Sequence, residues 1–248
     1  MERRVILADF ADTDLPTIIH SRGWESLCDV PVTYPSVLIQ EFYSNMHGTP
    51  IVVTLQLVAD VLHVLRVEHP DYLDCECLRT MFKDEMISTF CERPADWGDH
   101  QFTQCRRFAK GPRFMNMVMT FVLHPLSHYN SITEPRAQFL LSLLEHITID
   151  FPSHFIFFIL DVHRDTTTHD KLIFPSAITR ILCHFSIPFS SFNHFLVMYA
   201  IDYTTVKRSE VQFRLRWSGT AARPTPSTPS TSAPSTSAGG VTLDAIMA

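Results

Sequence analysis

The stretch Thr133-Glu-Pro-Arg-Ala-Gln-Phe-Leu-Leu-Ser-Leu-Leu-Glu-His-Ile147 carries the clearest helical signal in the chain. Thr133 is a residue type favoured just before a helix, and Pro135 suits the first turn because an N–H there has no helical partner. The apolar residues that follow recur at helical spacing, at Ala137, Leu140, Leu141, Leu144 and Ile147. The stretch therefore predicts an amphipathic helix whose apolar stripe faces the core.

Similar signals recur along the chain and predict a mainly α fold with at most a few short strands. Pro35 and Pro175 suit first helical turns, and Thr54 suits a helix cap. Further helices are predicted at 35–47, 54–65, 83–92, 114–123 and 175–185. Two apolar segments stay open, because 155–162 and 195–203 each fit either a helix or a strand.

Local details follow from the same patterns. Ser153 is expected to cap the helical alternative for 155–162, and residues 51–53 fit a short strand. The helix after Thr54 is expected to turn one apolar face inward, formed by Leu55, Val58, Leu62 and Leu65.

Composition divides the chain into four parts. Residues 1–20 are an N-terminal extension, and 21–217 have the apolar content of one globular helical domain. Residues 218–240 consist mostly of Ser, Thr, Pro, Ala and Gly, so they cannot bury enough apolar area to offset chain ordering. We predict a disordered linker there, followed at 241–248 by the start of a truncated helix.

Net charge, apolar runs and cysteine content limit the classes of protein to which this chain can belong. A net charge of -6 argues against a protein that coats nucleic acid along its whole surface. No apolar run reaches the length of about 18 residues that suggests a membrane span, and Asp9 interrupts any signal-peptide core. We expect an intracellular protein, nuclear or cytoplasmic, whose six cysteines are reduced thiols.

Five short blocks occur in order between Arg22 and Thr179. They are Arg22-Gly-Trp-Glu, Leu38-Ile-Gln-Glu-Phe-Tyr-Ser-Asn, Phe121-Val-Leu-His-Pro, Thr133-Glu-Pro-Arg-Ala and Leu172-Ile-Phe-Pro-Ser-Ala-Ile-Thr. Together they resemble the plant transposon protein domain family, a helical module of plant mobile elements related to retrotransposon reading frames. The resemblance implies a transposon-derived domain at 21–217, with a shortened N-terminal part, and it supplies no catalytic residue.

The sequence contains none of the common catalytic or cofactor motifs. It lacks the Gly-rich phosphate loops, the Gly-x-Ser-x-Gly nucleophile turn, the Asp-Thr/Ser-Gly of retroviral-type proteases and the Tyr-x-Asp-Asp of reverse transcriptases. Cys75-x-Cys77 is too closely spaced for a zinc chelate, and Pro125 separates His124 from His128. We therefore expect no enzyme activity, no cofactor and no metal site.

The densest group of candidate metal ligands begins at the end of the first open segment, 155–162, and continues after it. Its members are Asp161, His163, Asp165, His169 and Asp170. Carboxylates with imidazoles can bind Mg²⁺ or Mn²⁺ for phosphodiester cleavage. The same residue types are ordinary in a polar loop between two buried elements, and we prefer this interpretation.

Cations lie beside aromatic residues in two places. The first cluster is Arg106, Arg107, Lys110 and Arg113, and the second is Lys207, Arg208, Arg214 and Arg216. Such clusters can bind phosphates and stack bases, and the second is our predicted nucleic-acid site.

The preferred function is a non-enzymatic interaction module that binds a protein partner or itself, with a weak nucleic-acid contact. One alternative is a metal-dependent, phosphodiester-cleaving enzyme that resembles a transposase or nuclease. The other is a translated transposon remnant without present function.

Overall fold

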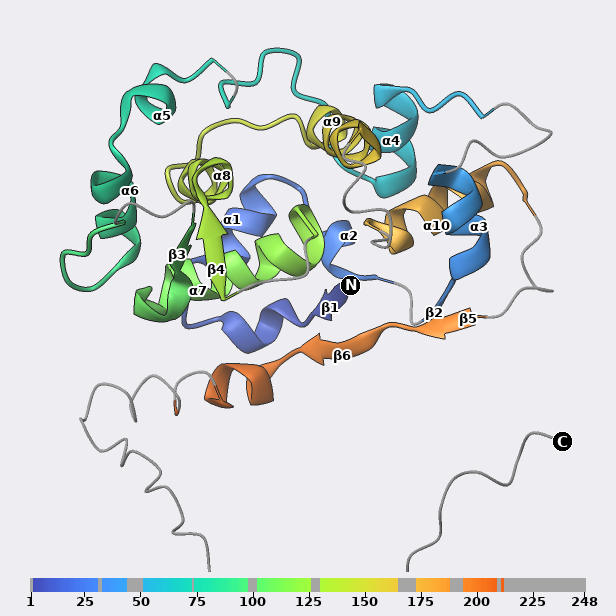
Figure 1. Cartoon of the computed structure of the whole chain (residues 1–248). Helices are drawn as coiled ribbons and strands as arrows, with labels where there is room; N and C mark the ends of the chain where they lie inside the picture. Colours follow the sequence, from blue (N-terminus) through green and yellow to red (C-terminus); the bar gives the residue numbers. More distant parts are fainter. Residues whose placement is uncertain are drawn as a thin grey trace, which may run out of the picture. The chain divides into compact units, whose positions relative to one another are not determined.

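The computed structural model describes residues 2–30, 33–43, 51–72, 74–97, 102–125, 130–164, 173–187, 194–208 and 211. All of them belong to the first of two compact units, Met1–Phe213. The predicted linker at 218–240 and truncated helix at 241–248 lie outside the described residues. Within the first unit, helices form most of the structure and the strands are short, as predicted (Figure 1).

The N-terminal extension is part of the folded unit. It forms strand β1 (Arg3–Val5), the 3-10 helix η1 (Leu7–Phe10) and helix α1 (Leu15–Ser21), which is followed by α2 (Glu25–Cys28). Phe10, Ile18 and Ile19 are buried in the core. Strand β1 pairs in parallel with β6 (Met198–Ile201), so the two ends of the unit lie side by side (Figure 1).

The open segment 195–203 is mainly strand. Strand β5 (His194–Leu196) pairs antiparallel with β2 (Thr33–Pro35), and β6 follows it directly. A short helical segment covers 203–208. A third two-stranded sheet joins β3 (Phe102–Gln104) to β4 (Ser131–Thr133). These pairings satisfy backbone groups with partners that are distant in sequence, which local patterns do not reveal.

Most predicted helices are confirmed with adjusted bounds. They are α3 (Ser36–Tyr43), α4 (Leu55–Leu62), α6 (Lys83–Phe90) and α10 (Pro175–His184), and α5 (Glu76–Thr80) is an addition. Thr54 Oγ1 accepts from the Leu57 N–H at 3.1 Å, so its predicted capping role is confirmed. Pro35, in contrast, ends β2 instead of starting α3.

Two local predictions near α4 are wrong. Leu65 is exposed, because α4 ends at Leu62 and His63 adopts a left-handed conformation with φ 54° that turns the chain away. Residues 51–53 form no strand, since none of the described strands pairs with them. Val58 and Leu62 are buried as predicted.

Three helices build the centre of the core. Helix α7 (Lys110–Val118) continues into a π-helical segment, η3 (Met119–Leu123), which ends before Pro125 as the sequence predicts. Helix α8 (Glu134–Leu144) packs against both α6 and α7. It is buried on most sides, because Phe139 and Leu143 are enclosed in addition to the predicted Leu140 and Leu141.

The open segment 155–162 belongs to a helix, α9 (Phe151–Arg164), which packs against α4 (Figure 1). Its cap is Asp150 and not Ser153, because an Asp150 carboxylate oxygen accepts from the Ser153 N–H at 3.2 Å. The same carboxylate accepts from Arg66 Nε at 3.0 Å. No helix in the described ranges is long and apolar enough to cross a bilayer.

The cysteines only partly follow the sequence expectation. Cys28 and Cys105 are buried free thiols, as expected. Cys75 and Cys77 instead form a disulfide at the start of α5, which contradicts the fully reduced state expected for the chain. Their Cα atoms lie 5.4 Å apart, a separation that a disulfide spans readily.

Candidate functional site

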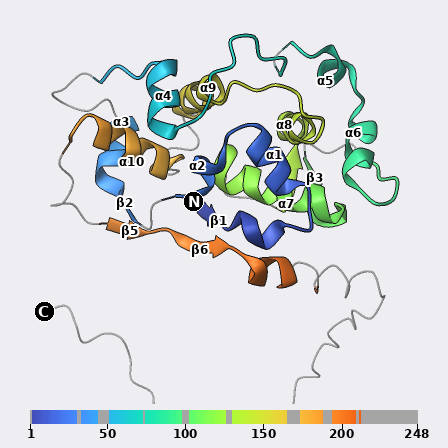
Figure 2. The ribbon, with the colours of Figure 1, turned by 180° about the vertical axis from the view of Figure 1, so that it is seen from behind.

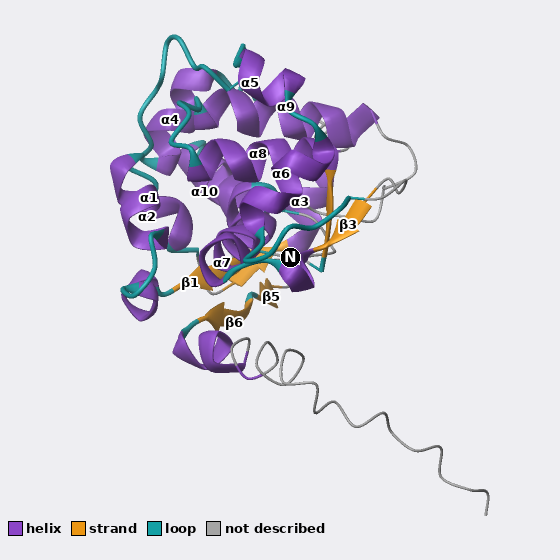
Figure 3. Cartoon of the chain, turned by 90° about the vertical axis from the view of Figure 1, so that its left-hand side faces the viewer, coloured by secondary structure: helices purple, strands orange, loops and turns teal. Residues whose placement is uncertain are grey.

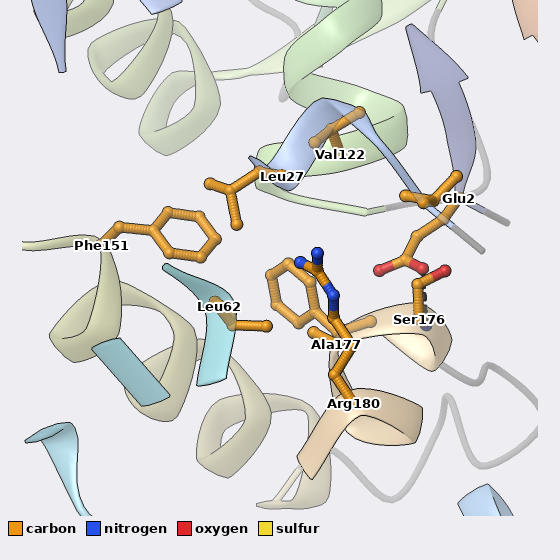
Figure 4. Close-up of a pocket in the computed structure, with 10 residues that line it drawn as sticks. Glu2, Leu27, Leu62, Val122, Phe151, Ser176, Ala177 and Arg180 are labelled. Carbon is orange, nitrogen blue, oxygen red and sulfur yellow. Dashed lines mark hydrogen bonds between the residues drawn. The ribbon is translucent and has the colours of Figure 1, made fainter. Parts of the chain in front are cut away.

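A small cavity lies where the N-terminal residues meet α10 (Figure 4). Glu2 and Arg180 point toward it, and its apolar wall includes Leu27, Leu62 and Phe151. The cavity measures about 20 Å³, which is room for about one water molecule. It is therefore far smaller than a pocket for an organic substrate, which takes roughly 300 Å³ or more.

The Glu2 carboxyl group closes one side of this cavity. It is buried, and its Oε2 accepts from the Ser176 N–H at 2.6 Å, in the first turn of α10. Burial raises the pKa of Glu2 to about 7, although the Ser176 hydrogen bonds and the Arg180 charge oppose that rise. The contact ties the N-terminus to a helix start whose dipole favours negative charge.

Two arginines within the five sequence blocks have structural roles. Arg22 donates to the Ile147 carbonyl at 2.9 Å and to the Ser142 carbonyl at 3.0 Å, so it binds the C-terminal end of α8. Arg136 is buried and donates to Thr120 Oγ1. Desolvation lowers the pKa of each guanidinium to about 10, so both stay charged at neutral pH.

A pair of histidines is the main polar feature that the sequence reading missed. His124 Nδ1 and His154 Nε2 lie 3.3 Å apart, at the end of η3 and in the first turn of α9. Phe158 stacks on His124 with ring centroids 3.8 Å apart, and Phe139 stacks on His154 at 4.3 Å. Desolvation lowers both pKa values, that of His154 to about 4. The pair is therefore neutral at physiological pH.

One feature of the sequence indicates that His154 is buried in this position. His154 falls three residues after Phe151 and four before Phe158, on the same helical stripe as these buried side chains. Its partner His124 lies 30 residues earlier in the chain, and no local pattern in the sequence indicates that contact. Two histidines alone do not complete a metal site, and no group of three or more metal-ligating side chains occurs among the described residues.

The acidic candidates for metal binding are only partly described. Asp161 is exposed near the C-terminal end of α9. Asp165, His169 and Asp170 lie outside the described residues.

The predicted nucleic-acid site is also partly described. Lys207 and Arg208 are exposed on the segment 203–208, and Lys207 Nζ lies 5.1 Å from the Tyr203 ring centroid. Arg214 and Arg216 lie outside the described residues. Lys110 forms an ion pair with Asp12. The hydrogen bond from Lys110 is the main cause that lowers the pKa of the Asp12 carboxyl, and the charges of Lys110 and Lys207 lower it further.

A group of exposed apolar side chains follows the last two strands. Phe195, Leu196, Tyr199 and Tyr203 are 54%, 73%, 91% and 56% exposed, and we call them the C-terminal strand surface. The sequence reading missed it because 195–203 was equally consistent with a buried element. A second exposed pair, Phe157 and Leu160, lies one turn apart on α9.

Comparison with known proteins identifies a family. A family model described as "Putative plant retrotransposon-related domain" matches residues 20–188, a span that contains all five sequence blocks. No curated protein and no solved structure matches the chain.

Proposed function

The chain belongs to the plant retrotransposon-related domain family, and from this premise we propose that it is a non-enzymatic interaction module of a plant mobile element. The family assignment makes the protein transposon-derived. Its biochemical role is our inference from the surface and the interior of the folded unit.

The C-terminal strand surface is the observation that carries this proposal. Among the described residues of 195–203, four large apolar side chains are more than half exposed, and apolar side chains exposed in such density mark sites of association. Tyr199 is 91% exposed, so its ring gains nothing from burial within its own chain. A partner that covers this surface would bury apolar area now in contact with water.

The interior supports the same proposal, because its polar groups hold elements together. Arg22 joins the end of α1 to the end of α8, Glu2 joins the N-terminus to α10, and Asp150 caps α9 while binding Arg66. Each of these side chains has a structural partner that explains its position. The cavity between Glu2 and Arg180 is too small for a substrate.

A weak nucleic-acid contact is a secondary part of the proposal. It is favoured by the exposure of Lys207 and Arg208 within the predicted cluster of cations. Such a contact would rest mainly on phosphate charge and would therefore weaken steeply with salt.

A nicking assay tests the proposal. Purified protein incubated with supercoiled plasmid and single-stranded DNA, with Mg²⁺ or Mn²⁺, is expected to cut neither substrate. Any binding should fall strongly with added salt and should weaken further in the variant Lys207→Glu/Arg208→Glu. Asp161→Ala is the matched variant and should bind as the unchanged protein does. Metal-dependent nicking that Asp161→Ala abolishes would replace the interaction module with the nuclease.

A further inference from the structure

The disulfide between Cys75 and Cys77 lies at the margin of the first unit. Helix α5 begins directly after Cys75 and lies beside α8, on the outside of the helical unit (Figures 1 and 2). The view from the side also places α5 at the margin, above α8 (Figure 3). Cys77 is exposed, whereas Cys75 is half-buried and packs against the core. The two cysteines of one bond therefore differ in their exposure to solvent.

Contacts other than the disulfide hold this segment in place. The Cys75 N–H donates to the Asp71 carbonyl at 2.7 Å. Gln138 Nε2 on α8 donates to the Leu78 carbonyl at 3.1 Å, and the Leu78 side chain is buried. None of these contacts involves a sulfur atom. The segment can therefore keep its conformation when the bond between the two sulfur atoms is broken.

The position of the disulfide favours chemical exchange over a structural role. Its loop contains a single residue, Glu76, between the two cysteines. A disulfide stabilises a fold mainly by restricting the unfolded chain, and this restriction becomes smaller as the loop becomes shorter. Exposed disulfides are in general the labile ones, whereas structural disulfides resist reduction. A short loop and an exposed cysteine thus occur together at this bond.

We propose that the Cys75–Cys77 disulfide exchanges reversibly with small thiols, and that the incoming thiolate attacks Cys77. A bond forms between the thiolate and Cys77 Sγ, the protein disulfide breaks, and its electron pair leaves with Cys75 Sγ, which takes a proton from water. The product carries a mixed disulfide at Cys77 and a thiol at Cys75.

Two reactions then remove the mixed disulfide. Cys75 can attack Cys77 Sγ, which restores the protein disulfide and releases the small thiol. A second small thiolate can instead attack the sulfur of the bound thiol, which releases Cys77 as a thiolate. In that case two small thiols are oxidised to their disulfide, and the protein disulfide is reduced to two thiols.

Charge near the disulfide determines which thiols react fastest. Asp71, Asp74 and Glu76 are exposed within the segment 71–79, and Arg79 is its single Lys or Arg. An Arg79 guanidinium nitrogen lies 3.2 Å from an Asp74 carboxylate oxygen. The segment therefore has an excess of negative charge, which attracts a cationic thiol and repels an anionic one. We expect a preference for cationic thiols such as cysteamine.

Reaction of the full chain with cystamine, the disulfide of cysteamine, tests the site of exchange. Peptide mass spectrometry after acid quenching and alkylation reports which cysteine carries the mixed disulfide. Cys75→Ser should accumulate it at Cys77, because the thiol that would displace it is missing. Cys77→Ser should react about tenfold more slowly or less, because the remaining Cys75 is half-buried. Cys183→Ser removes an exposed cysteine outside the pair and should leave the protein disulfide intact, as in the unchanged chain.

Thermal unfolding of the same variants separates exchange from loss of the fold. All three variants should melt at nearly the temperature of the unchanged chain, because the contacts that hold α5 use no sulfur atom. A mixed disulfide at Cys75, or equal rates for Cys75→Ser and Cys77→Ser, would overturn the inference.

Reduction of the unchanged chain gives a measurement that needs no substitution. Cysteamine should reduce the disulfide in the folded protein, and faster per thiolate than the anionic mercaptopropionate does at low salt. The two rates should converge in about 1 M salt, where the screening length is about 3 Å. A disulfide that is reduced only after unfolding in urea would refute the exchange, and equal rates at low salt would refute the preference for cations.

Discussion

At the residue scale, the buried polar groups determine how the unit responds to pH. Glu2 and His154 have pKa values shifted in opposite directions from their ordinary values, Glu2 upward and His154 downward. Both shifts come mainly from desolvation, which disfavours the charged form of each group. The two groups therefore change stability with opposite signs as the solution is acidified.

Glu2 gives the first of these pH predictions. Between its ordinary pKa of 4.5 and its folded pKa of about 7, the folded chain holds a proton that the unfolded chain has lost, so stability falls as pH rises. The full effect is on the order of 3 kcal/mol at pH values above that window. Glu2→Gln should remove this loss, because the amide oxygen still accepts from Ser176 and carries no charge.

Urea unfolding at two pH values checks this prediction. Glu2→Gln should stabilise the protein relative to the unchanged chain at pH values above 7, with little difference near pH 5. Glu85→Gln serves as the control, since Glu85 is exposed on α6. Equal effects of Glu2→Gln at both pH values would show that Glu2 keeps an ordinary pKa.

The histidine pair gives the stability of the fold the opposite dependence on pH. From pH 6.5 down to about 4 the unfolded chain binds protons that folded His154 does not, so stability falls with acidification. Replacing both His124 and His154 by Phe should flatten this acid limb of the unfolding curve, because neither ring then titrates. His184→Gln, on an exposed residue of α10, should leave the acid limb unchanged.

At the scale of single elements, α8 shows that residues on the same apolar face of a helix can be buried to different extents. Leu140 is fully buried, whereas Leu144 lies one turn later and is only partly buried. Leu140→Ala should therefore lower the free energy of unfolding by about 2 to 5 kcal/mol, the usual cost of such a core truncation. Leu144→Ala should cost clearly less, as measured by thermal or denaturant unfolding. Equal losses would place Leu144 in the core as well.

The elements also show which signals in the sequence are sufficient to predict where a helix begins. Thr54 and Pro175 start α4 and α10 as predicted, because caps and first-turn prolines act on their own neighbours. The sequence predicts Ser153 as the cap of α9, but the helix begins earlier, at Phe151, so Asp150 precedes it and accepts from the Ser153 N–H. Pro35 was read as a helix start because its strand partner, β5, comes about 160 residues later.

The features of the candidate site were harder to predict from the sequence than the helices were. Lys207 and Arg208 belong to the cluster of cations beside aromatic residues that the sequence predicts as a site, and both are exposed. The His124–His154 contact and the pairing of β5 with β2 both join segments that only the fold brings together. Order along the chain was enough to identify the family, because the five blocks carry that signal without any contact between them.

At the scale of the whole first unit, its two ends contribute to one sheet. Arg3 pairs with Met198 and Val5 with Ile201, while Ile201 and Val5 are buried in the common core. Removing residues 1–6 should therefore lower the melting temperature of the entire unit in a single transition, because β6 loses its partner and the core loses apolar area.

A tail deletion is the matched control for that experiment. Residues 218–240 contain no aliphatic side chain larger than Ala, so removing 218–248 should leave the melting temperature of the core unchanged. Differential scanning calorimetry compares the two truncations directly. A core that melts alike with and without residues 1–6 would show that β1 is dispensable.

The β1–β6 pairing has a consequence for the order of events during synthesis. Strand β1 is made before the other described elements of the unit, but its partner β6 is made after nearly all of them. A contact of such long sequence separation forms slowly, and until then the nascent N-terminus exposes an unpaired strand. Until β6 is made, the helices from α1 to α10 must fold without the β1–β6 pairing. A chaperone that binds extended apolar segments would therefore meet this chain first at residues 3–10, and release would coincide with the emergence of β6.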